Sequence, residues 1–371
     1  MKNIIIILGT RPEAIKLAPV ILELRKNKNY KIFVCNTEQQ KELSNQTLNF
    51  FGITPDFKLD SMIPNQTLAE IQSRILERLS AIYAHNKFDA TIVQGDTITA
   101  FSGSLTSFYN HIPLFYVESG LRNHNLAAPF PEEGLRQMIS RIADLHFAPT
   151  KIDYDALLKD NISEHKITIT GNTVIDALSF LSDETIKNAG VLLEKQGIQF
   201  NDKLVLITTH RRENHGHRLD IILQAVADLT KKFCDHQFIL PVHPNPNVCD
   251  KVYSVLKNIP NLILTSPFSY PELVCIMKDS KLVLTDSGGI QEEASTFGMP
   301  VLVMRNETDR NECVNNGHAK LVGADYDKIV FEASEILAQD KSNTRLTKIK
   351  NAYGDGNASQ KIANSITNFW K

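Results

Sequence analysis

Short apolar runs recur along the whole chain, and each is followed by a longer segment with helical periodicity. The runs are rich in β-branched residues and are bounded by turn residues, which is typical of strands. Between them, apolar residues recur three and four positions apart, which indicates helices. Because the runs are almost continuously apolar, we expect parallel sheets that are buried on both faces. The chain should therefore adopt an α/β fold.

The predicted strands form two series, and a length of 371 residues also favours two domains at roughly 150 residues each. We expect residues 1–170 to form an N-terminal α/β domain and residues 171–360 a C-terminal one, with a linker near 183–202 and a last helix at about 361–371 packing back on the first domain. The predicted strands are residues 4–8, 31–35, 90–93, 113–117, 167–170, 204–208, 238–242, 261–264, 281–285 and 301–304, and the clearest early helices are residues 12–27, 68–84 and 99–110. We interpret the pattern as two doubly wound, Rossmann-like domains that face one another across a cleft.

Charge and composition exclude several classes of protein. Forty Lys and Arg against 42 Asp and Glu give 40 − 42 = −2, which argues against a polybasic partner of nucleic acid or of a membrane surface. The apolar runs are shorter than the ~18 residues of a membrane span, and the first is too short for a signal peptide. The five cysteines include no CxxC pair, so we expect neither a disulfide framework nor a structural metal. The prediction is a cytoplasmic protein.

Ligands of doubly wound sheets bind where strands end and loops lead into helices, so the residues after each predicted strand are the informative ones. The first strand ends in GTRPEAIK, which brings Arg11 and Lys16 to a helix N-terminus and suits an anion such as phosphate. This segment contains neither GxGxxG nor GxxxxGK[ST], so a dinucleotide fingerprint and a Walker loop are both missing. The alternative is a polar helix cap with solvated cations.

Two carboxylates follow neighbouring strands of the first series, Asp96 in QGDT and Glu118 in VESGLR. Such a pair suits general acid–base chemistry, because different environments separate the pKa values of two carboxyl groups. The alternative is that Asp96 caps a helix and Glu118 pairs with Arg122. Downstream, PFPEEGLR adds Glu132 as a third candidate, whose alternative role is a helix-face pair with Arg136.

The second series offers residues that suit phosphate binding. His210 lies in THRREN after one strand, and His243 lies in PVHPNPN after the next. A histidine beside arginines can donate a proton to a leaving phosphate. The surrounding histidines follow no metal-ligand spacing, so we expect no zinc.

The segment LTDSGGIQEE is the most specific motif for a nucleotide. Ser287, Gly288 and Gly289 form a small-residue turn that opens a helix, and its backbone N–H groups suit a diphosphate. Glu293, one turn further on, suits the hydroxyls of a ribose, and Arg310 in MRNETDRNE is expected nearby. The alternative is an ordinary glycine-rich capped helix. Together with the carboxylates, these residues indicate a nucleotide sugar as ligand.

Ten motifs occur in order over almost the whole length: GTRPEAIK, QGDT, VESGLR, PFPEE, HFAPT, TGNTVIDAL, THRREN, PVHPNPN, DSGGIQEE and YGDG. In these motifs the chain resembles the non-hydrolysing UDP-N-acetylglucosamine 2-epimerases. The resemblance implies a glycosyltransferase-B-like fold, a homodimer, no cofactor, and interconversion of UDP-N-acetylglucosamine and UDP-N-acetylmannosamine for surface polysaccharide synthesis. It also implies that the second domain binds the UDP moiety.

The implied reaction removes the C2 proton and UDP to give 2-acetamidoglucal, and UDP then adds back with the proton delivered to the opposite face. By resemblance, the catalytic residues are Asp96, Glu118, Glu132 and His210, and the substrate-binding residues are Arg11, Lys16, Arg136, His243, Ser287, Gly288, Gly289, Glu293 and Arg310. The motifs do not decide which carboxylate is the base and which is the acid.

Several positions depart from the family pattern. Leu135 stands where the family usually has asparagine, and Asn123 stands in place of threonine. Family members are often activated by a second UDP-N-acetylglucosamine, but Gln40, Glu42 and Asn65 replace residues expected at that site, which counts against such an activator here. The alternatives are a hydrolysing 2-epimerase, a 2-epimerase of a modified UDP-sugar and, less favoured, a retaining glycosyltransferase.

Overall fold

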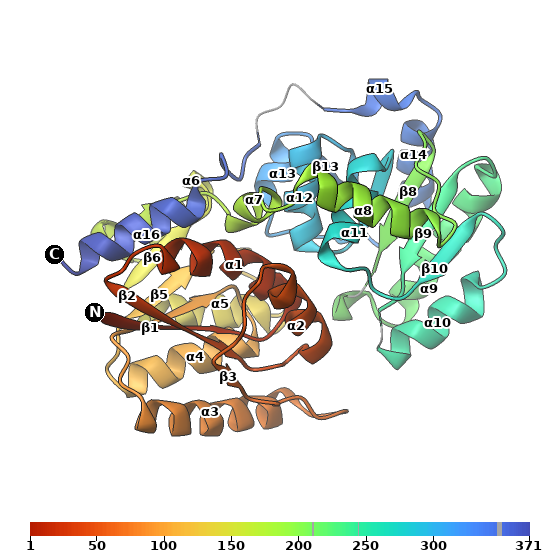
Figure 1. Ribbon diagram of the computed structural model, residues 1–371. Coiled ribbons are helices and arrows are strands. Elements are labelled where there is room, and N and C mark those ends of the chain that lie inside the picture. Colours follow the sequence, from red (N-terminus) through yellow and green to blue (C-terminus); the bar gives the residue numbers. More distant parts are fainter. Residues whose placement is uncertain (210, 244, 347–350) are drawn as a thin grey trace. The chain divides into compact units, whose positions relative to one another are not determined.

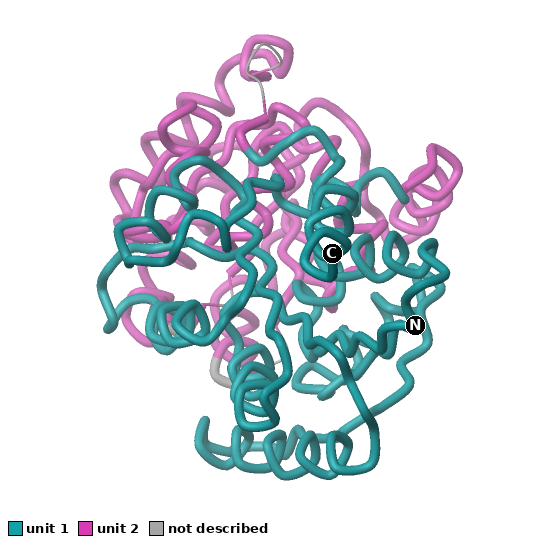
Figure 2. Tube along the Cα trace, turned by 90° about the vertical axis from the view of Figure 1, so that its left-hand side faces the viewer, with its two compact units in different colours: residues 1–180, 353–371 teal, residues 181–352 magenta. Residues whose placement is uncertain are grey.

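The computed structural model describes residues 1–209, 211–243, 245–346 and 351–371 (Figure 1). Its contacts divide the chain into two compact units, coloured separately in Figure 2. Unit 1 comprises Met1–Phe180 and Tyr353–Lys371, and unit 2 comprises Leu181–Ala352. The expected border between residues 170 and 171, taken as a border between independently folding domains, stays a prediction.

Unit 1 is built on a seven-stranded parallel sheet with the strand order β3-β2-β1-β4-β5-β6-β7. The strands are β1 (Lys2–Leu8), β2 (Tyr30–Asn36), β3 (Phe57–Lys58), β4 (Ala90–Gln94), β5 (Leu114–Val117), β6 (Leu145–Ala148) and β7 (Ile167–Ile169). The strand order reverses between β1 and β4, so successive right-handed crossovers cover opposite faces of the sheet. This reversal creates the point at which a doubly wound sheet binds ligands.

The helices of unit 1 follow its strands in alternation. They are α1 (Arg11–Arg25), α2 (Lys41–Phe50), α3 (Leu68–His85), α4 (Ile98–Tyr109), α5 (Glu132–Ile142), α6 (Lys151–Lys159), the 3₁₀ turn η1 (Glu164–Lys166), α7 (Thr173–Leu178) and, after the return of the chain, α16 (Ala358–Phe369). Helix α16 packs within unit 1: Phe369 lies edge-on to Phe115 of β5, and Thr367 bonds to Tyr30 at 3.0 Å.

Unit 2 repeats the same topology with six parallel strands in the order β10-β9-β8-β11-β12-β13. The strands are β8 (Leu204–Thr208), β9 (Gln237–Pro241), β10 (Leu262–Thr265), β11 (Leu282–Thr285), β12 (Val301–Val303) and β13 (Ala319–Leu321). Its helices are α8 (Asp183–Glu194), η2 (Arg212–Asn214), α9 (His217–Lys232), α10 (Pro246–Leu256), α11 (Tyr270–Asp279), α12 (Gly288–Phe297), α13 (Asn311–Asn315), α14 (Tyr326–Leu337) and α15 (Lys341–Thr344). The strand order reverses here between β8 and β11.

The predicted fold class is confirmed, because both sheets are entirely parallel and alternate with helices. Every predicted strand is present within two residues of its expected bounds. Strands β3, β6 and β13 were not predicted, because their sequences FK, LHFA and AKL contain no β-branched residue. The predicted linker at 183–202 is wrong for most of its length: α8 fills it, is capped by Ser182 and buries Ala189 and Leu193.

Over the residues that the structure describes, no helix is both long enough and apolar enough to cross a bilayer.

The turn between β1 and α1 shows how the sequence TRPE fixes a helix start. Thr10 and Glu13 form a capping box, in which Glu13 Oε2 accepts hydrogen bonds from the N–H groups of Gly9 at 3.0 Å and Thr10 at 2.8 Å. The other oxygen of Glu13 accepts a bond of 2.6 Å from the Thr97 hydroxyl in the β4–α4 turn. Burial raises the pKa of Glu13 to about 7, against the opposing effect of these hydrogen bonds. A single buried carboxyl group therefore joins the two central turns of the sheet.

We predict that unit 1 loses stability as Glu13 ionises. The folded state binds this proton more tightly than the unfolded chain, so the contribution of the protonated form is complete below about pH 4.5 and is lost as the pH rises through about 7. Glu13→Gln removes the titratable group. It should therefore flatten this decline in the unfolding free energy, which amounts to up to about 3 kcal/mol. Calorimetric melting temperatures at pH 5, 6, 7 and 8 measure it.

The matched control for Glu13 is Glu70, which forms the same capping box with Thr67 at the exposed start of α3. Its backbone hydrogen bond to Thr67 lowers the pKa of Glu70, so its contribution is lost as the pH falls rather than as it rises. Glu70→Gln should therefore not flatten the decline. If the melting temperatures of the wild type and of Glu13→Gln change with pH in the same way, Glu13 does not titrate in this range.

Candidate active site

The candidate residues of unit 1 follow β1 and β4, between which the strand order reverses, and the next strand, β5. Gly9 and Arg11 come directly after β1, Asp96 comes after β4, and Glu118 comes after β5. The turn after β1 lies close to neighbouring segments at Gly9. An added Cβ there would lie 1.9 Å from the Thr37 hydroxyl and 2.6 Å from that of Thr99. Only glycine fits there. The parallel sheet thus brings three candidate segments to one edge.

Glu118 is a buried carboxylate that contacts donors from three different elements. Its backbone has a φ of 61°, an uncommon conformation for a residue with a side chain and one that often marks functional positions. Lys16 of α1 forms an ion pair with Oε1, and both side chains are 4% exposed. Gln94, the last residue of β4, donates to Oε2, and Asn172 donates to Oε1 at 3.0 Å. These donors stabilise the ionised form of the carboxyl group.

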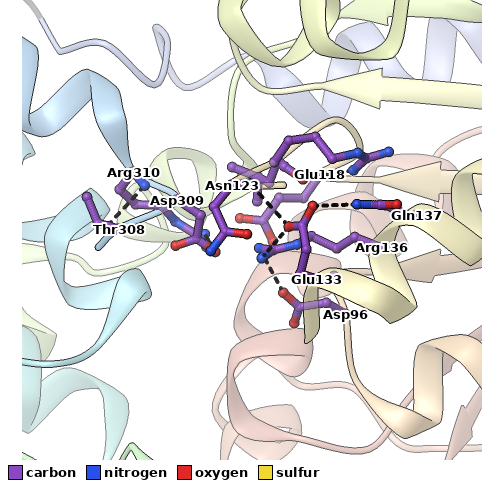
Figure 3. A network of polar contacts seen from close by, with 12 residues as sticks. Asp96, Glu118, Asn123, Glu133, Arg136, Gln137, Thr308, Asp309 and Arg310 are labelled. Carbon is purple, nitrogen blue, oxygen red and sulfur yellow. Dashed lines mark hydrogen bonds and ion pairs between the residues drawn. The ribbon is translucent and has the colours of Figure 1, made fainter. Parts of the chain in front are cut away.

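Asp96 contacts the second buried cation of unit 1. Arg136 of α5 has a side chain that is 1% exposed, and it lies 3.2 Å from Asp96 Oδ2 and 3.1 Å from Glu133 Oε2 (Figure 3). Glu133 is fully buried and also accepts hydrogen bonds from the N–H groups of Asn123 and His124, at 3.2 Å each. Asp96 itself stays about a quarter exposed, so it is the accessible end of this chain of charges.

The alternative roles considered for Asp96, a helix cap, and for Glu118, a pair with Arg122, are both wrong. Thr97, and not Asp96, caps α4, because its side chain accepts a hydrogen bond from Ala100 N at 3.0 Å. Arg122 does not pair with Glu118: its guanidinium binds Asp160 at 2.9 Å and the Ser140 hydroxyl at 2.8 Å. Asp96 and Glu118 are therefore not accounted for by helix capping or by the nearest arginine in sequence.

Three further predicted positions of unit 1 have separate environments. Glu132 opens α5 and is half-buried, and its neighbour Glu133 is the carboxylate that lies against Arg136. Leu135 belongs to the apolar core of unit 1. Arg11 lies in the β1–α1 turn, where Gln40 accepts a bond of 3.0 Å from its backbone N–H.

In unit 2, Asp286 organises the loop that carries THRREN. This carboxylate follows β11, is fully buried, and accepts hydrogen bonds from Thr209 Oγ1 at 3.1 Å, Arg211 N at 3.0 Å and Asn214 Nδ2 at 3.0 Å. The predicted histidine of this loop, His210, lies outside the described residues. Sequence analysis missed Asp286, although it stands directly before the predicted anion-binding turn.

The start of α12 combines backbone donors with a guanidinium. Within the described residues, the Ser287 side chain makes no capping bond to this helix. An added Cβ on Gly288 would lie 3.2 Å from the Arg310 guanidinium carbon, whereas one on Gly289 would meet open space. Arg310 is held by Glu292 at 2.6 Å and by Asp309 at 2.8 Å, and its backbone N–H donates to Thr308 (Figure 3). This arrangement suits a phosphate group.

Two further predicted residues of unit 2, Glu293 and His243, are buried and half-buried, respectively. Glu293 is 4% exposed, next to Glu292, the partner of Arg310. His243 is half-buried, and its Nδ1 accepts a bond of 3.2 Å from Asn245 N. That bond makes Nδ1 an acceptor, which in the neutral imidazole corresponds to the tautomer with hydrogen on Nε2. Among the described residues no group of three acidic, histidine or cysteine side chains is arranged to hold a metal ion.

Comparison with known proteins gives consistent matches over the whole chain. Residues 22–367 match the family model described as UDP-N-acetylglucosamine 2-epimerase. The UDP-N-acetylglucosamine 2-epimerase of Yersinia pestis is 42% identical over 370 residues, covering 99% of this chain and 98% of that protein. The crystal structure of the Neisseria meningitidis UDP-GlcNAc 2-epimerase bound to UDP-GlcNAc is similar with a TM-score of 0.93 and 40% identity, covering 99% of this chain and 100% of that one. The glycotransferase of kitacinnamycin, at 12% identity and a TM-score of 0.62, shares the fold alone and covers 99% of this chain and 98% of that one.

We predict that Lys16 and Glu118 are energetically coupled. Lys16→Met removes the cation from a buried carboxylate, which typically costs about 3–5 kcal/mol of unfolding free energy. The double variant Lys16→Met/Glu118→Gln also removes the charge that needs compensation, so it should be clearly more stable than Lys16→Met alone. Chemical unfolding of the four proteins in the cycle measures the coupling. Additive losses from the two single changes would contradict it.

Proposed function

The chain belongs to the UDP-N-acetylglucosamine 2-epimerase family, and we propose that it interconverts UDP-N-acetylglucosamine and UDP-N-acetylmannosamine without hydrolysing them. The observation that carries the proposal is the pair of carboxylates at adjacent strand ends of unit 1, each in contact with a buried cation. A family relationship at 42% identity over 99% of the chain supports the same substrate class.

The reaction requires inversion at a carbon whose proton is hardly acidic, since C2 lies beside an acetamido group and not beside a carbonyl. Elimination solves this problem: a base removes the C2 proton, the C1–O bond to UDP breaks, and the electron pair forms the C1–C2 double bond of 2-acetamidoglucal. UDP then adds back at C1 while an acid delivers a proton to the other face of C2. The net reaction needs no external oxidant and consumes no water.

We assign the acid–base chemistry to Asp96, Glu118 and Glu132, with the family's phosphate-side histidine at His210. Each of the two strand-end carboxylates has a buried cation as its neighbour, Lys16 beside Glu118 and Arg136 beside Asp96. The distribution of base and acid roles among the three carboxylates stays open.

The diphosphate of UDP is proposed to bind at the start of α12, with Ser287, Gly288 and Gly289 supplying backbone donors and Arg310 a guanidinium. Arg11 adds charge for the departing phosphate, His243 offers its Nε2–H, and Glu293 binds the ribose. Stabilising the leaving UDP lowers the barrier to C1–O cleavage, because negative charge develops on the phosphate as the bond breaks.

The reaction is tested by proton NMR of the purified protein with UDP-N-acetylglucosamine in D₂O, without added NAD or metal. We expect UDP-N-acetylmannosamine with deuterium at C2, because the removed proton exchanges with solvent before its return. Free N-acetylmannosamine and UDP would instead identify a hydrolysing enzyme. Turnover of a modified UDP-sugar, with none of UDP-N-acetylglucosamine, would contradict the proposed substrate.

We predict that Asp96→Asn and Glu118→Gln each lower turnover by about 10²-fold or more, the scale of lost acid–base catalysis. Affinity for UDP should change far less, since neither residue is assigned to the nucleotide. Coupled assays of kcat and calorimetric titration with UDP measure the two effects. The control is Asp160→Asn, which removes a carboxylate from the Arg122 pair and should leave turnover near that of the wild type. Near-normal turnover in both site variants would remove them from the catalytic set.

A homodimer, the expected assembly of the family, is the second part of the proposal. Size-exclusion chromatography with light scattering should give twice the mass of one chain. The proposal does not include a second UDP-N-acetylglucosamine as an activator. Gln40 replaces a residue expected at that site, and its side-chain oxygen accepts a hydrogen bond from Arg11 N. A hyperbolic dependence of rate on substrate concentration is therefore expected.

A further inference from the structure

The motifs TGNTVIDAL and YGDG meet in unit 1 although they lie about 180 residues apart in the sequence. Asn172 N donates to Tyr353 O at 2.7 Å. The backbones approach so closely that a Cβ on Gly171 would lie 3.0 Å from Tyr353 O, and one on Gly354 would lie 3.2 Å from Gly171 Cα. Both glycines have positive φ, 89° and 118°. We call Gly171, Asn172, Tyr353 and Gly354 the crossover junction, because the chain leaves unit 1 after Phe180 and re-enters it at Tyr353.

A second set of bonds fixes the returning helix at the same place. Asp176 of α7 accepts hydrogen bonds from Ala358 N at 3.1 Å, Ser359 N at 2.7 Å and the Ser359 hydroxyl at 2.6 Å. These are donors of the first turn of α16, so Asp176 supplies the cap that this helix lacks locally. The crossover junction is therefore held from both α7 and α16.

Asn172 uses the two ends of its side chain for different purposes. Its Oδ1 caps α7 by accepting a bond of 3.1 Å from Val174 N, and its Nδ2 donates to Glu118 Oε1 at 3.0 Å. The side chain is buried, as is Glu118. The carboxamide carries the acceptor for the helix and the donor for the carboxylate on two separate atoms, so Asn172 makes both bonds at once.

We propose that Asn172 is a positioning residue for Glu118, which it ties through the crossover junction to the segment where the chain returns from unit 2. The amide N–H fixes one oxygen of Glu118 beside Lys16, while the backbone bond to Tyr353 fixes Asn172 itself. The return segment is thereby linked to Glu118 through Asn172. The catalytic consequence rests on the proposed function, whereas the placement of Glu118 does not.

The decisive variant is Asn172→Asp, because aspartate is nearly isosteric and caps helices as well as asparagine does. It keeps the cap on α7, removes the donor to Glu118 and places a second carboxylate beside it. We expect the melting temperature to fall, because two buried carboxylates then lie side by side with one donor fewer, and Glu118 to titrate at a higher pH, by about one unit, since like charges disfavour ionisation. Carbon NMR of protein labelled at glutamate carboxyls follows this titration, with the Glu118 signal assigned by its loss in Glu118→Gln.

The matched control is Ser359→Ala, which removes one of the bonds between Asp176 and the first turn of α16 beside the crossover junction and leaves the bond between Asn172 and Glu118 in place. We expect a lower melting temperature and an unchanged Glu118 titration. A Glu118 titration in Asn172→Asp that matches the wild type overturns the proposal. An equal shift in Ser359→Ala also overturns it, because a general loosening of the junction then explains the effect.

Activity gives the second readout and separates the two proposals. If the wild type epimerises, Asn172→Asp should lower kcat by about 10-fold or more, because a misplaced catalytic group reacts more slowly. The limb of the pH–rate profile that reports Glu118 should also move to higher pH. A wild-type kcat and profile in this variant would overturn the positioning role. If the wild type shows no epimerisation, the proposed function fails, and the carboxyl titration still decides whether Asn172 positions Glu118.

Discussion

The buried carboxylate of Glu118 is the constraint on which most of unit 1 depends. An ionised group taken out of water is tolerated only when charges and hydrogen-bond donors surround it. Here those donors come from α1, from the end of β4 and from the start of α7. Three elements that are far apart in the sequence must therefore be placed correctly at once. The same group that the proposed chemistry needs thus also specifies how the helices pack against the sheet.

Each sheet uses a buried carboxyl group to join the two turns at which its strand order reverses. In unit 1, Glu13 bonds to the β1–α1 turn and to Thr97 after β4. In unit 2, Asp286 after β11 accepts bonds from Thr209, Arg211 and Asn214 after β8. The reversal separates two crossover helices and opens a space for a ligand, and it also leaves backbone and side-chain donors that need partners. A carboxylate with two oxygens satisfies several of these donors at once.

Much of the fold could be predicted because strand and helix periodicities are local properties. The capping residues Thr10, Thr97 and Ser182 lie one position before helices that the structure confirms or adds. Strands such as β3 and β13 were missed because they contain no β-branched residue and are stabilised by their neighbours in the sheet. The prediction of a linker was wrong for a related reason. The few apolar residues of this segment stabilise a helix only when α11 packs beside α8.

The α/β class, the strands that carry the candidate residues and the family follow from the order of the amino acids, because motifs and apolar periodicity are local properties of the chain. Which polar groups meet depends on how the elements pack. The packing pairs Glu133 with Arg136 and Glu292 with Arg310, although the adjacent glutamates were the ones singled out. Neighbouring residues on a helix point about 100° apart, so the packing of the helix decides which partners each of them meets. The packing also joins Asn172 to Glu118, because contacts across such sequence distances arise only when the sheet edge brings their loops together.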